Sequence, residues 1–156
     1  MGWLEGDAER DYEIDAPLEE VIDYFASPDN FSPCLSEMES VDKVGDSRWK
    51  FVMQEMSAKG ISFQGEYEVE YEREGSTVRW FPAGGEGNMK SEGKADFEES
   101  SDGTVHVSYQ ETISVELPIP SLMTKVFKPI VSKQVSKGVN GMLDCCKKTL
   151  EEQADG

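Results

Sequence analysis

Histidine and cysteine are scarce in this chain of 156 residues, which contains one histidine, His106, and three cysteines. A structural zinc site needs four ligands at short spacings, and the thiols of Cys34, Cys145 and Cys146 are all far from His106 in sequence. We therefore expect no metal and no other cofactor. The cysteine count is odd and two cysteines are adjacent, so the pattern predicts reduced thiols rather than a disulfide framework. With no Gly-x-Ser-x-Gly elbow either, the sequence gives no candidate for a catalytic nucleophile.

Basic residues are also few, because 15 Lys and Arg stand against 32 Asp and Glu and give a formal net charge of -17. A field of that sign repels phosphate backbones, so we expect no nucleic-acid partner. No apolar run approaches the roughly 20 residues that span a bilayer. The first residues lack the basic and apolar regions of a secretory signal, so we expect a cytoplasmic protein.

The remaining composition is that of a folded protein, with 37% hydrophobic and 10% aromatic residues. That content is too apolar for a disordered chain. At this length a single domain over residues 1–156 is the default, with an ordered core at about 8–152 and frayed ends. We expect a monomer or a weak dimer.

Hydrophobic periodicity predicts an α+β order in the first quarter of the chain. Alternation over residues 8–15 indicates a strand. Helical spacing from Leu18 to Phe25, followed by a weaker helical stretch over 29–35, indicates two short helices.

The rest of the chain is predicted to be a meander closed by a helix. Residues 38–117 alternate between apolar and polar and are divided by glycine-containing turns, which indicates about six antiparallel strands with one acidic face. From Val131 to Leu150 apolar residues recur every three or four positions, which predicts a long amphipathic helix covering the apolar face. Because Pro129 interrupts the pattern, we expect 121–128 to form a separate turn or a kinked first section.

Three segments resemble the START-like helix-grip superfamily (SRPBCC). Residues 15–25 look like its opening strand-to-helix junction, with Ala16-Pro17 followed by Val21 and Phe25; 30–35 follow it, and 141–151 are similar to its closing helix. The nearest branch in appearance is that of polyketide cyclases/dehydrases and lipid-transport proteins, which includes coenzyme-Q-binding proteins and proteins like the G subunit of carbon monoxide dehydrogenase. The resemblance covers about residues 8–152. It implies a curved antiparallel sheet of about seven strands around a long C-terminal helix, with two short helices after the first strand and an apolar cavity that holds a hydrophobic small molecule.

Large side chains on the covered register of the strands, and apolar side chains of the closing helix opposite, are candidates for ligand contact. Any one of them is equally normal in a solid core. Glycines at 65, 93, 138 and 141 face the same space in this scheme, and small residues on opposed surfaces favour a cavity of at least roughly 300 Å3. The candidate ligand-binding residues are Trp49, Phe51, Met53, Phe63, Tyr67, Trp80, Met89, Tyr109, Glu111, Val135, Val139 and Met142.

Glu111 is the one acidic residue that falls on the apolar register of its strand, between Tyr109 and Ile113. A buried carboxylate is costly unless it is paired, protonated or hydrated. One interpretation makes Glu111 a polar anchor for a ligand or a general base. The other turns it to solvent, because a slip of one residue reverses its face.

Two further features have structural interpretations. His106 lies on the polar register, which favours a surface role. The run Gly84-Gly85-Glu86-Gly87 is not followed by Lys-Ser/Thr and lies between strands, so it predicts a hairpin loop rather than a phosphate-binding loop.

Lysines gather in the last part of the chain, where residues 118–150 contain six lysines and one acidic residue. They either counterbalance the acidic sheet or dock transiently on an anionic membrane. The docking residues in the second interpretation are Lys125, Lys128, Lys133 and Lys137.

The sequence thus predicts a protein that binds, and transports, a lipid, quinone, isoprenoid or polyketide-like molecule. One alternative is a cyclase, aromatase or hydratase that uses the same cavity, with Glu111 or Tyr109 assisting proton transfer. The other is a ligand-free interaction module like the helix-grip co-chaperones, for which a tightly packed interior is expected.

Overall fold

The computed structural model describes residues 3–84 and 87–155. Its strands are β1 (Trp3–Ile14), β2 (Met38–Lys43), β3 (Arg48–Met53), β4 (Met56–Ala58), β5 (Ile61–Phe63), β6 (Glu66–Glu74), β7 (Thr77–Pro82), β8 (Met89–Glu99) and β9 (Val105–Glu116). Its helices are α1 (Leu18–Ala26), α2 (Pro28–Phe31) and α3 (Thr124–Asp155), with short 3-10 turns η1 (Ser32–Cys34) and η2 (Ser121–Met123).

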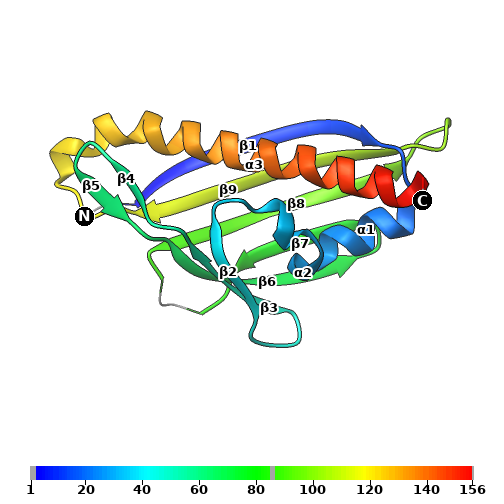
Figure 1. Ribbon diagram of the computed structural model, residues 1–156, viewed down its shortest axis with the longest axis horizontal. Helices are drawn as coiled ribbons and strands as arrows, with labels where there is room; N and C mark the ends of the chain where they lie inside the picture. The colour runs from blue at the N-terminus through cyan, green and yellow to red at the C-terminus, as the bar shows by residue number, and fades with distance from the viewer. Residues whose placement is uncertain (1–2, 85–86, 156) are drawn as a thin grey trace.

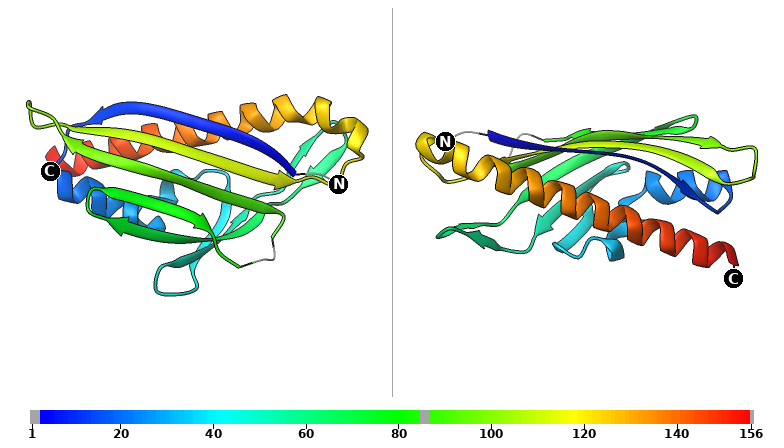
Figure 2. Two further views of the ribbon diagram at one scale, coloured as in Figure 1. Left: turned by 180° about the vertical axis from the view of Figure 1, so that it is seen from behind. Right: turned by 90° about the horizontal axis from the view of Figure 1, so that it is seen from above.

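Seven strands form one antiparallel sheet in the order β1-β9-β8-β7-β6-β3-β2. The sheet curves, and α3 lies along its concave face with α1 and α2 at one end (Figures 1 and 2). This arrangement confirms the α+β helix-grip fold. β4 and β5 form a separate hairpin near the start of α3 (Figure 1).

β1 is longer than its alternation predicted, and the expectation of a frayed start before residue 8 was wrong. Its residues pair with β9 from Trp3 opposite Glu116 onwards. Gly6 conceals the pattern because it occupies an inward position without a side chain. A Cβ there would lie 2.7 Å from Cγ2 of Val135, so the glycine lets α3 approach the strand closely.

The β4–β5 hairpin is not evident from the alternation of residues 38–117. Ile61 and Phe63 alternate in step with Tyr67, but they form β5 and Tyr67 lies in β6. Lys59 and Gly60 both have positive φ, 49° and 81°, as a two-residue hairpin turn of the primed type requires. The chain then turns again before β6, which makes the hairpin a flap beside the main sheet.

α3 is one helix from Thr124 to Asp155, so 121–128 is not a separate turn, and the helix continues beyond 152. A kink at Pro129 stays a prediction. Pro129 lies in the second turn and is exposed. There it removes only one intrahelical hydrogen bond, close to an end where several N–H groups have no helical partner in any case.

The outer face of the sheet is acidic but ordered in its charges. From His106 to Ser114, β9 presents neutral and histidine side chains outward. On one side lies β1, whose outward side chains from Glu5 to Glu13 are all acidic, and on the other lies β8, whose outward side chains include Lys90 and Lys94 as well as acidic residues. In this row Gln110 lies opposite Glu9, and Ser108 lies between Asp11 and Asp96. Acidic side chains of β1 and β8 are thus separated by the width of a strand.

His106 ends this row on the outer face, as its polar register predicted. Its Nδ1 lies 2.7 Å from Oε1 of Glu13 and its Nε2 lies 3.5 Å from Oδ1 of Asp11. The hydrogen bond to Glu13 is the main cause that raises the pKa of His106. Gly84–Gly87 lies partly outside the described residues, so its assignment as a hairpin loop stays a prediction.

Candidate functional site

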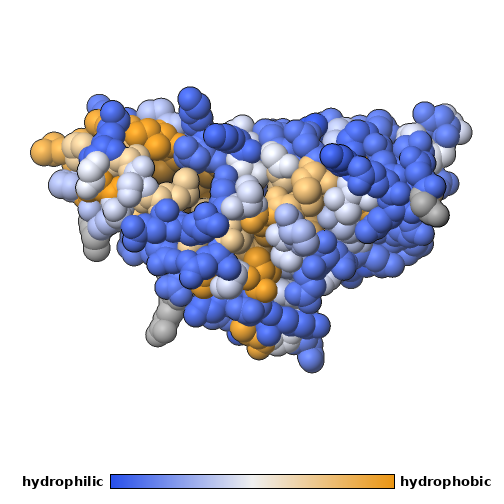
Figure 3. Space-filling view, in the orientation of Figure 1, coloured by the Kyte–Doolittle hydropathy of each residue, from blue (hydrophilic) through white to orange (hydrophobic). Residues whose placement is uncertain are grey.

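A cavity of about 210 Å3 opens between the concave face of the sheet and the first half of α3. The β4–β5 hairpin and the segment 35–38 complete its walls. Figure 3 shows apolar surface around a hollow between α3 and this hairpin. The cavity is where the helix-grip fold was expected to hold a ligand.

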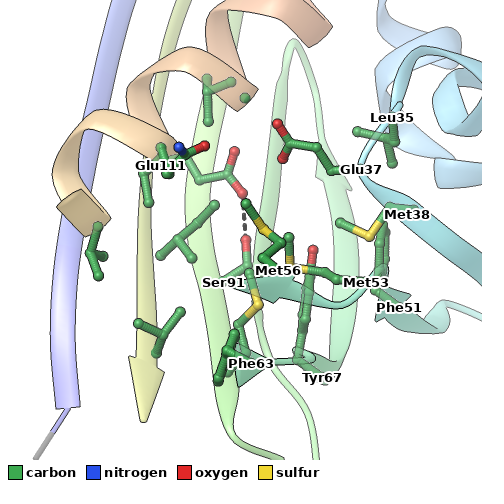
Figure 4. Close-up of a pocket in the computed structure, with 18 of the residues that line it drawn as sticks. Leu35, Glu37, Met38, Phe51, Met53, Met56, Phe63, Tyr67, Ser91 and Glu111 are labelled. Carbon is green, nitrogen blue, oxygen red and sulfur yellow. Dashed lines mark hydrogen bonds between the residues drawn. The ribbon is translucent and has the colours of Figure 1, made fainter. Parts of the chain in front are cut away.

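Most of the candidate ligand-binding residues line this cavity, and Figure 4 shows several of them pointing into it. Those in its walls are Phe51, Met53, Phe63, Tyr67, Met89, Tyr109, Glu111, Val135, Val139 and Met142. Their positions agree with the prediction, and their contact with a ligand stays a prediction.

Trp49 and Trp80 are not in the cavity walls, although both lie on the inner face. Trp49 is buried and donates a hydrogen bond from Nε1 to Oδ1 of Asp29 at 3.1 Å. Trp80 stacks between Tyr71 and Tyr109, with ring centroids 5.6 and 5.2 Å away. These tryptophans close the cavity off from the packed end of the molecule.

The cavity is smaller than the roughly 300 Å3 that the glycines led us to expect, because neighbouring side chains occupy the space they leave. A Cβ on Gly65 would lie 2.6 Å from Sδ of Met89, and one on Gly93 would lie 2.7 Å from Cζ2 of Trp80. A Cβ on Gly138 would lie 3.0 Å from a carboxyl oxygen of Glu37.

The position of Gly141 contradicts the glycine argument in another way. It is exposed, and nothing lies within 4 Å of a Cβ built there.

The methionines that fill the cavity are flexible and unbranched, so they can move aside for a ligand.

Glu111 points into the cavity from β9 rather than to solvent, and its role as an anchor or a base stays a prediction (Figure 4). The hydroxyl of Ser91 donates to its Oε2 at 2.5 Å and the hydroxyl of Tyr109 donates to its Oε1 at 2.8 Å. Burial raises the pKa of Glu111, and these hydrogen bonds partly oppose the rise. A carboxyl that protonates more readily than usual is therefore held inside an apolar chamber.

The indole N–H of Trp80 adds an unusual feature next to this carboxyl. It is buried and has no hydrogen-bond partner among the described residues. Its proximity to Glu111 lowers the pKa of that carboxyl slightly. Trp80 therefore affects the pKa of Glu111 without lining the cavity itself.

Sequence reasoning missed four polar wall residues and two methionines. They are Glu37, Ser57, Ser91 and Gln134, with Met38 and Met56. Ser91 was detectable, because it shares the inward register of β8 with Met89. Glu37 lies just before β2, where no periodicity fixes the direction of a side chain.

The cysteines contradict the expectation of three reduced thiols. Cys34 of η1 and Cys145 of α3 form a disulfide with a Cα–Cα distance of 5.6 Å, although they are 111 residues apart. The third, Cys146, is free and buried, and burial raises the pKa of its thiol to about 12. Spacing in sequence gave no sign of this pair, because the fold alone brings η1 against α3.

The lysine-rich segment lies on the exposed side of α3. Lys125, Lys128, Lys133 and Lys137 are all exposed and take part in no ion pair within residues 3–84 and 87–155. Leu122, just before the helix, is 90% exposed. The first turn of α3 thus combines free positive charge with an exposed apolar side chain beside the cavity.

The described residues contain neither a membrane-spanning helix nor a cluster of metal ligands. No helix there is long and apolar enough to cross a bilayer. No three His, Cys, Asp or Glu side chains gather in that part of the chain as metal ligands would.

Solved structures share the fold at low sequence identity. TTHA0849 from Thermus thermophilus is 22% identical with a TM-score of 0.69, covering 95% of this chain and 99% of that one. A START superfamily protein from Mycobacterium smegmatis is 12% identical with a TM-score of 0.66, covering 94% and 98%. The Zhui aromatase/cyclase of a Streptomyces species is 9% identical with a TM-score of 0.68, covering 96% and 95%.

These similarities show that the chain shares its fold with proteins of the START superfamily and with an aromatase/cyclase. No curated protein matches the chain. The model of one family, the G subunit of carbon monoxide dehydrogenase (CoxG), matches residues 11–146. That match covers most of the sequence, and the chain belongs to the CoxG family.

Proposed function

We propose that the protein binds a hydrophobic small molecule, such as a lipid, quinone, isoprenoid or polyketide-like compound, and carries it between sites. The observation that supports this most directly is the cavity itself, which is apolar in its walls and contains a hydrogen-bonded polar group at Glu111. Such a combination is typical of sites that bury an apolar body and orient one polar end. A ligand-free interaction module is the weaker interpretation, because it predicts a filled interior.

Native mass spectrometry of the gently purified protein tests this function. We expect an additional mass that organic extraction releases and that returns when the extracted protein is incubated with the same compound. A protein that carries no such mass, and gains none from a panel of lipids and quinones, would contradict the proposal.

Ligand loading at an anionic membrane is the second part of the proposal. Lys125 and Lys128 flank Phe127, a wall residue of the cavity, and Leu122 lies one turn before them. Each lysine near an anionic surface contributes about 1 kcal/mol of attraction. An exposed leucine beside them can enter the interfacial region while the cavity faces the lipid.

Vesicle co-sedimentation tests the membrane step. We expect Lys125→Glu with Lys128→Glu to weaken association with anionic vesicles in low salt. The matched control changes the exposed Lys43 and Lys148 to Glu, with the same change in net charge away from the mouth. A wild-type protein that ignores anionic vesicles in low salt, or equal losses in both variants, would remove this step.

A cyclase-type activity is the second candidate function, and the Ser91–Glu111–Tyr109 hydrogen bonds favour it. A buried carboxyl with a raised pKa beside a tyrosine hydroxyl is suited to proton transfer. The fold shared with an aromatase/cyclase is compatible with this. Turnover of a polyketide-like substrate that Glu111→Gln abolishes, while binding persists, would favour the enzyme over the carrier.

A further inference from the structure

The acidic and basic side chains in the cavity walls are all carboxyl groups. Glu37 and Glu111 are both carboxyls, and no Lys, Arg or His lines the cavity within the described residues. Figure 4 shows the two carboxyl groups entering from different walls and pointing toward each other across the cavity. No positive charge of the walls is therefore available to a bound anion.

Glu37 is held in place by packing rather than by a charged partner. Its carboxyl group lies against the backbone of α3 at Gly138, where a Cβ would come within 3.0 Å of Oε2. Within residues 3–84 and 87–155 this carboxyl has no hydrogen bond and no ion pair, and the side chain is half-buried. It thus presents unused acceptor oxygens to the cavity.

Tyr67 is close enough to the two carboxyls for both to affect its pKa. Its hydroxyl points into the cavity on the same side as the two carboxyl groups (Figure 4). Burial raises the pKa of Tyr67 well above its usual range, and the nearby charges of Glu111 and Glu37 raise it further. The polar part of the cavity therefore combines these acceptors with neutral hydroxyl and amide groups, among them Tyr67, Tyr71 and Gln134, and with no cationic side chain of the described residues.

We propose that the cavity selects hydrophobic molecules that carry a hydrogen-bond donor and no negative charge, such as long-chain alcohols or phenols, and rejects fatty acid carboxylates and phosphate-bearing lipids. Glu37 and Glu111 are the residues that determine this selection. The proposal rests on the proposed binding function and specifies the class of ligand for the same cavity.

The physical reason is the cost of an unpaired buried charge. An anion loses its hydration in an apolar cavity and meets two carboxyl groups of like sign with no cation to compensate it. A hydroxyl group instead donates to a carboxyl oxygen and accepts from Tyr67, so both of its hydrogen-bonding functions are satisfied. The same walls therefore favour a ligand that ends in a hydroxyl group and disfavour one that ends in an anion.

Competitive displacement of the uncharged fluorescent probe N-phenylnaphthylamine tests the selection at neutral pH. Decanol, decyl methyl ether and decanoate share one chain length and differ only in the polar end. We expect decanol to bind roughly tenfold or more tightly than decanoate, and more tightly than the ether, which has no donor. Glu37→Gln should reduce the discrimination against decanoate, whereas the control Glu55→Gln, an exposed residue outside the cavity walls, should not.

Each contrary result has a separate meaning. Decanoate that binds as tightly as decanol would overturn the selection while leaving the binding function in place. Equal discrimination in Glu37→Gln, Glu111→Gln and wild type, all with unchanged melting temperature, would overturn the assignment to these two residues. A cavity that takes up none of the probes would overturn the binding function together with the selection.

Discussion

The two halves of α3 carry the same spacing of apolar residues but enclose different interiors. In the second half Leu143 and Leu150 are 0% and 1% exposed, and α1 and the strands pack around them. In the first half Val131 and Val135 are each 8% exposed and border the cavity. The same amphipathic pattern thus seals one end of the molecule and leaves the other hollow.

The difference arises from what lies opposite the helix. At the packed end the short helix α1 contributes Ile22 and Phe25 to the core, and Phe25 contacts Phe97 with ring centroids 5.5 Å apart. At the hollow end the β4–β5 hairpin stands beside the sheet (Figure 2), and the side chains it contributes to the cavity walls are only half-buried or exposed. A helix therefore encloses a cavity where its partner is a flap rather than a packed layer.

The disulfide joins these two ends, and its loss should have the largest effect on stability. Cys34 precedes the wall segment 35–38, and Cys145 lies in the packed half of α3. For cysteines 111 residues apart, the chain-entropy model assigns about 5 kcal/mol to the bond. We expect Cys34→Ser with Cys145→Ser to lower the free energy of unfolding by that order, measured by urea denaturation.

A reductant provides the control for that experiment. It should destabilise the wild type to the same extent and leave the double variant unchanged. Wild-type stability that is indifferent to reductant would show that the bond does not contribute.

Truncation of leucines at the two ends should sharpen the comparison. Leu150→Ala leaves a void in a sealed region and should lower the free energy of unfolding by about 3 kcal/mol. Leu35→Ala at the half-buried cavity wall should lower it by about 1 kcal/mol, because the site is already partly open. Binding of an apolar probe should respond in the opposite order, and equal costs at both positions would break the distinction.

Glu111 gives the stability of the cavity a pH dependence of its own. Its pKa in the folded protein is raised from 4.5. In a pH window above 4.5, Glu111 is therefore still protonated in the folded protein but already ionised in the unfolded chain. Stability from this group is therefore present below that window and decreases as pH rises through it. We expect Glu111→Gln to remove this decrease, measured by urea denaturation between about pH 4 and 8.

The exposed Glu55→Gln is the matched control for that pH series, since it removes a carboxyl from the surface. It should retain the wild-type decrease. An unchanged pH profile in Glu111→Gln would show that this carboxyl is not the source.

Periodicity predicted the elements well because the sheet has one covered face and one wet face. Tyr67, Tyr109 and Val135 were placed in the cavity for that reason alone. Register shows which face of the sheet a side chain lies on, but it does not show which part of that face borders the cavity. Trp49 and Trp80 lie on the inner face for this reason, but outside the cavity walls.

The remaining errors concern features that depend on contacts between distant segments. Gly65 and Gly93 were interpreted as empty space, although the sequence cannot say that a methionine or a tryptophan enters it. The direction of Glu37 and the pairing of Cys34 with Cys145 likewise follow from the way η1 and the next residues lie against α3.

The neutral row of β9 on the outer face makes the sheet dependent on dissolved ions. Neighbouring strands lie about 4.8 Å apart, so the acidic side chains of β1 and β8 stand about 10 Å from each other across β9. That spacing is close to the Debye length at about 0.1 M salt, where repulsion over such a distance is largely screened. In dilute buffer the screening length grows, so Asp11 of β1 and Asp96 of β8 repel each other across Ser108, and Lys94 of β8, which pairs with Asp96, offsets only part of the negative charge of this face. A chain of net charge -17 should therefore keep its curved sheet most firmly in a salt-rich medium.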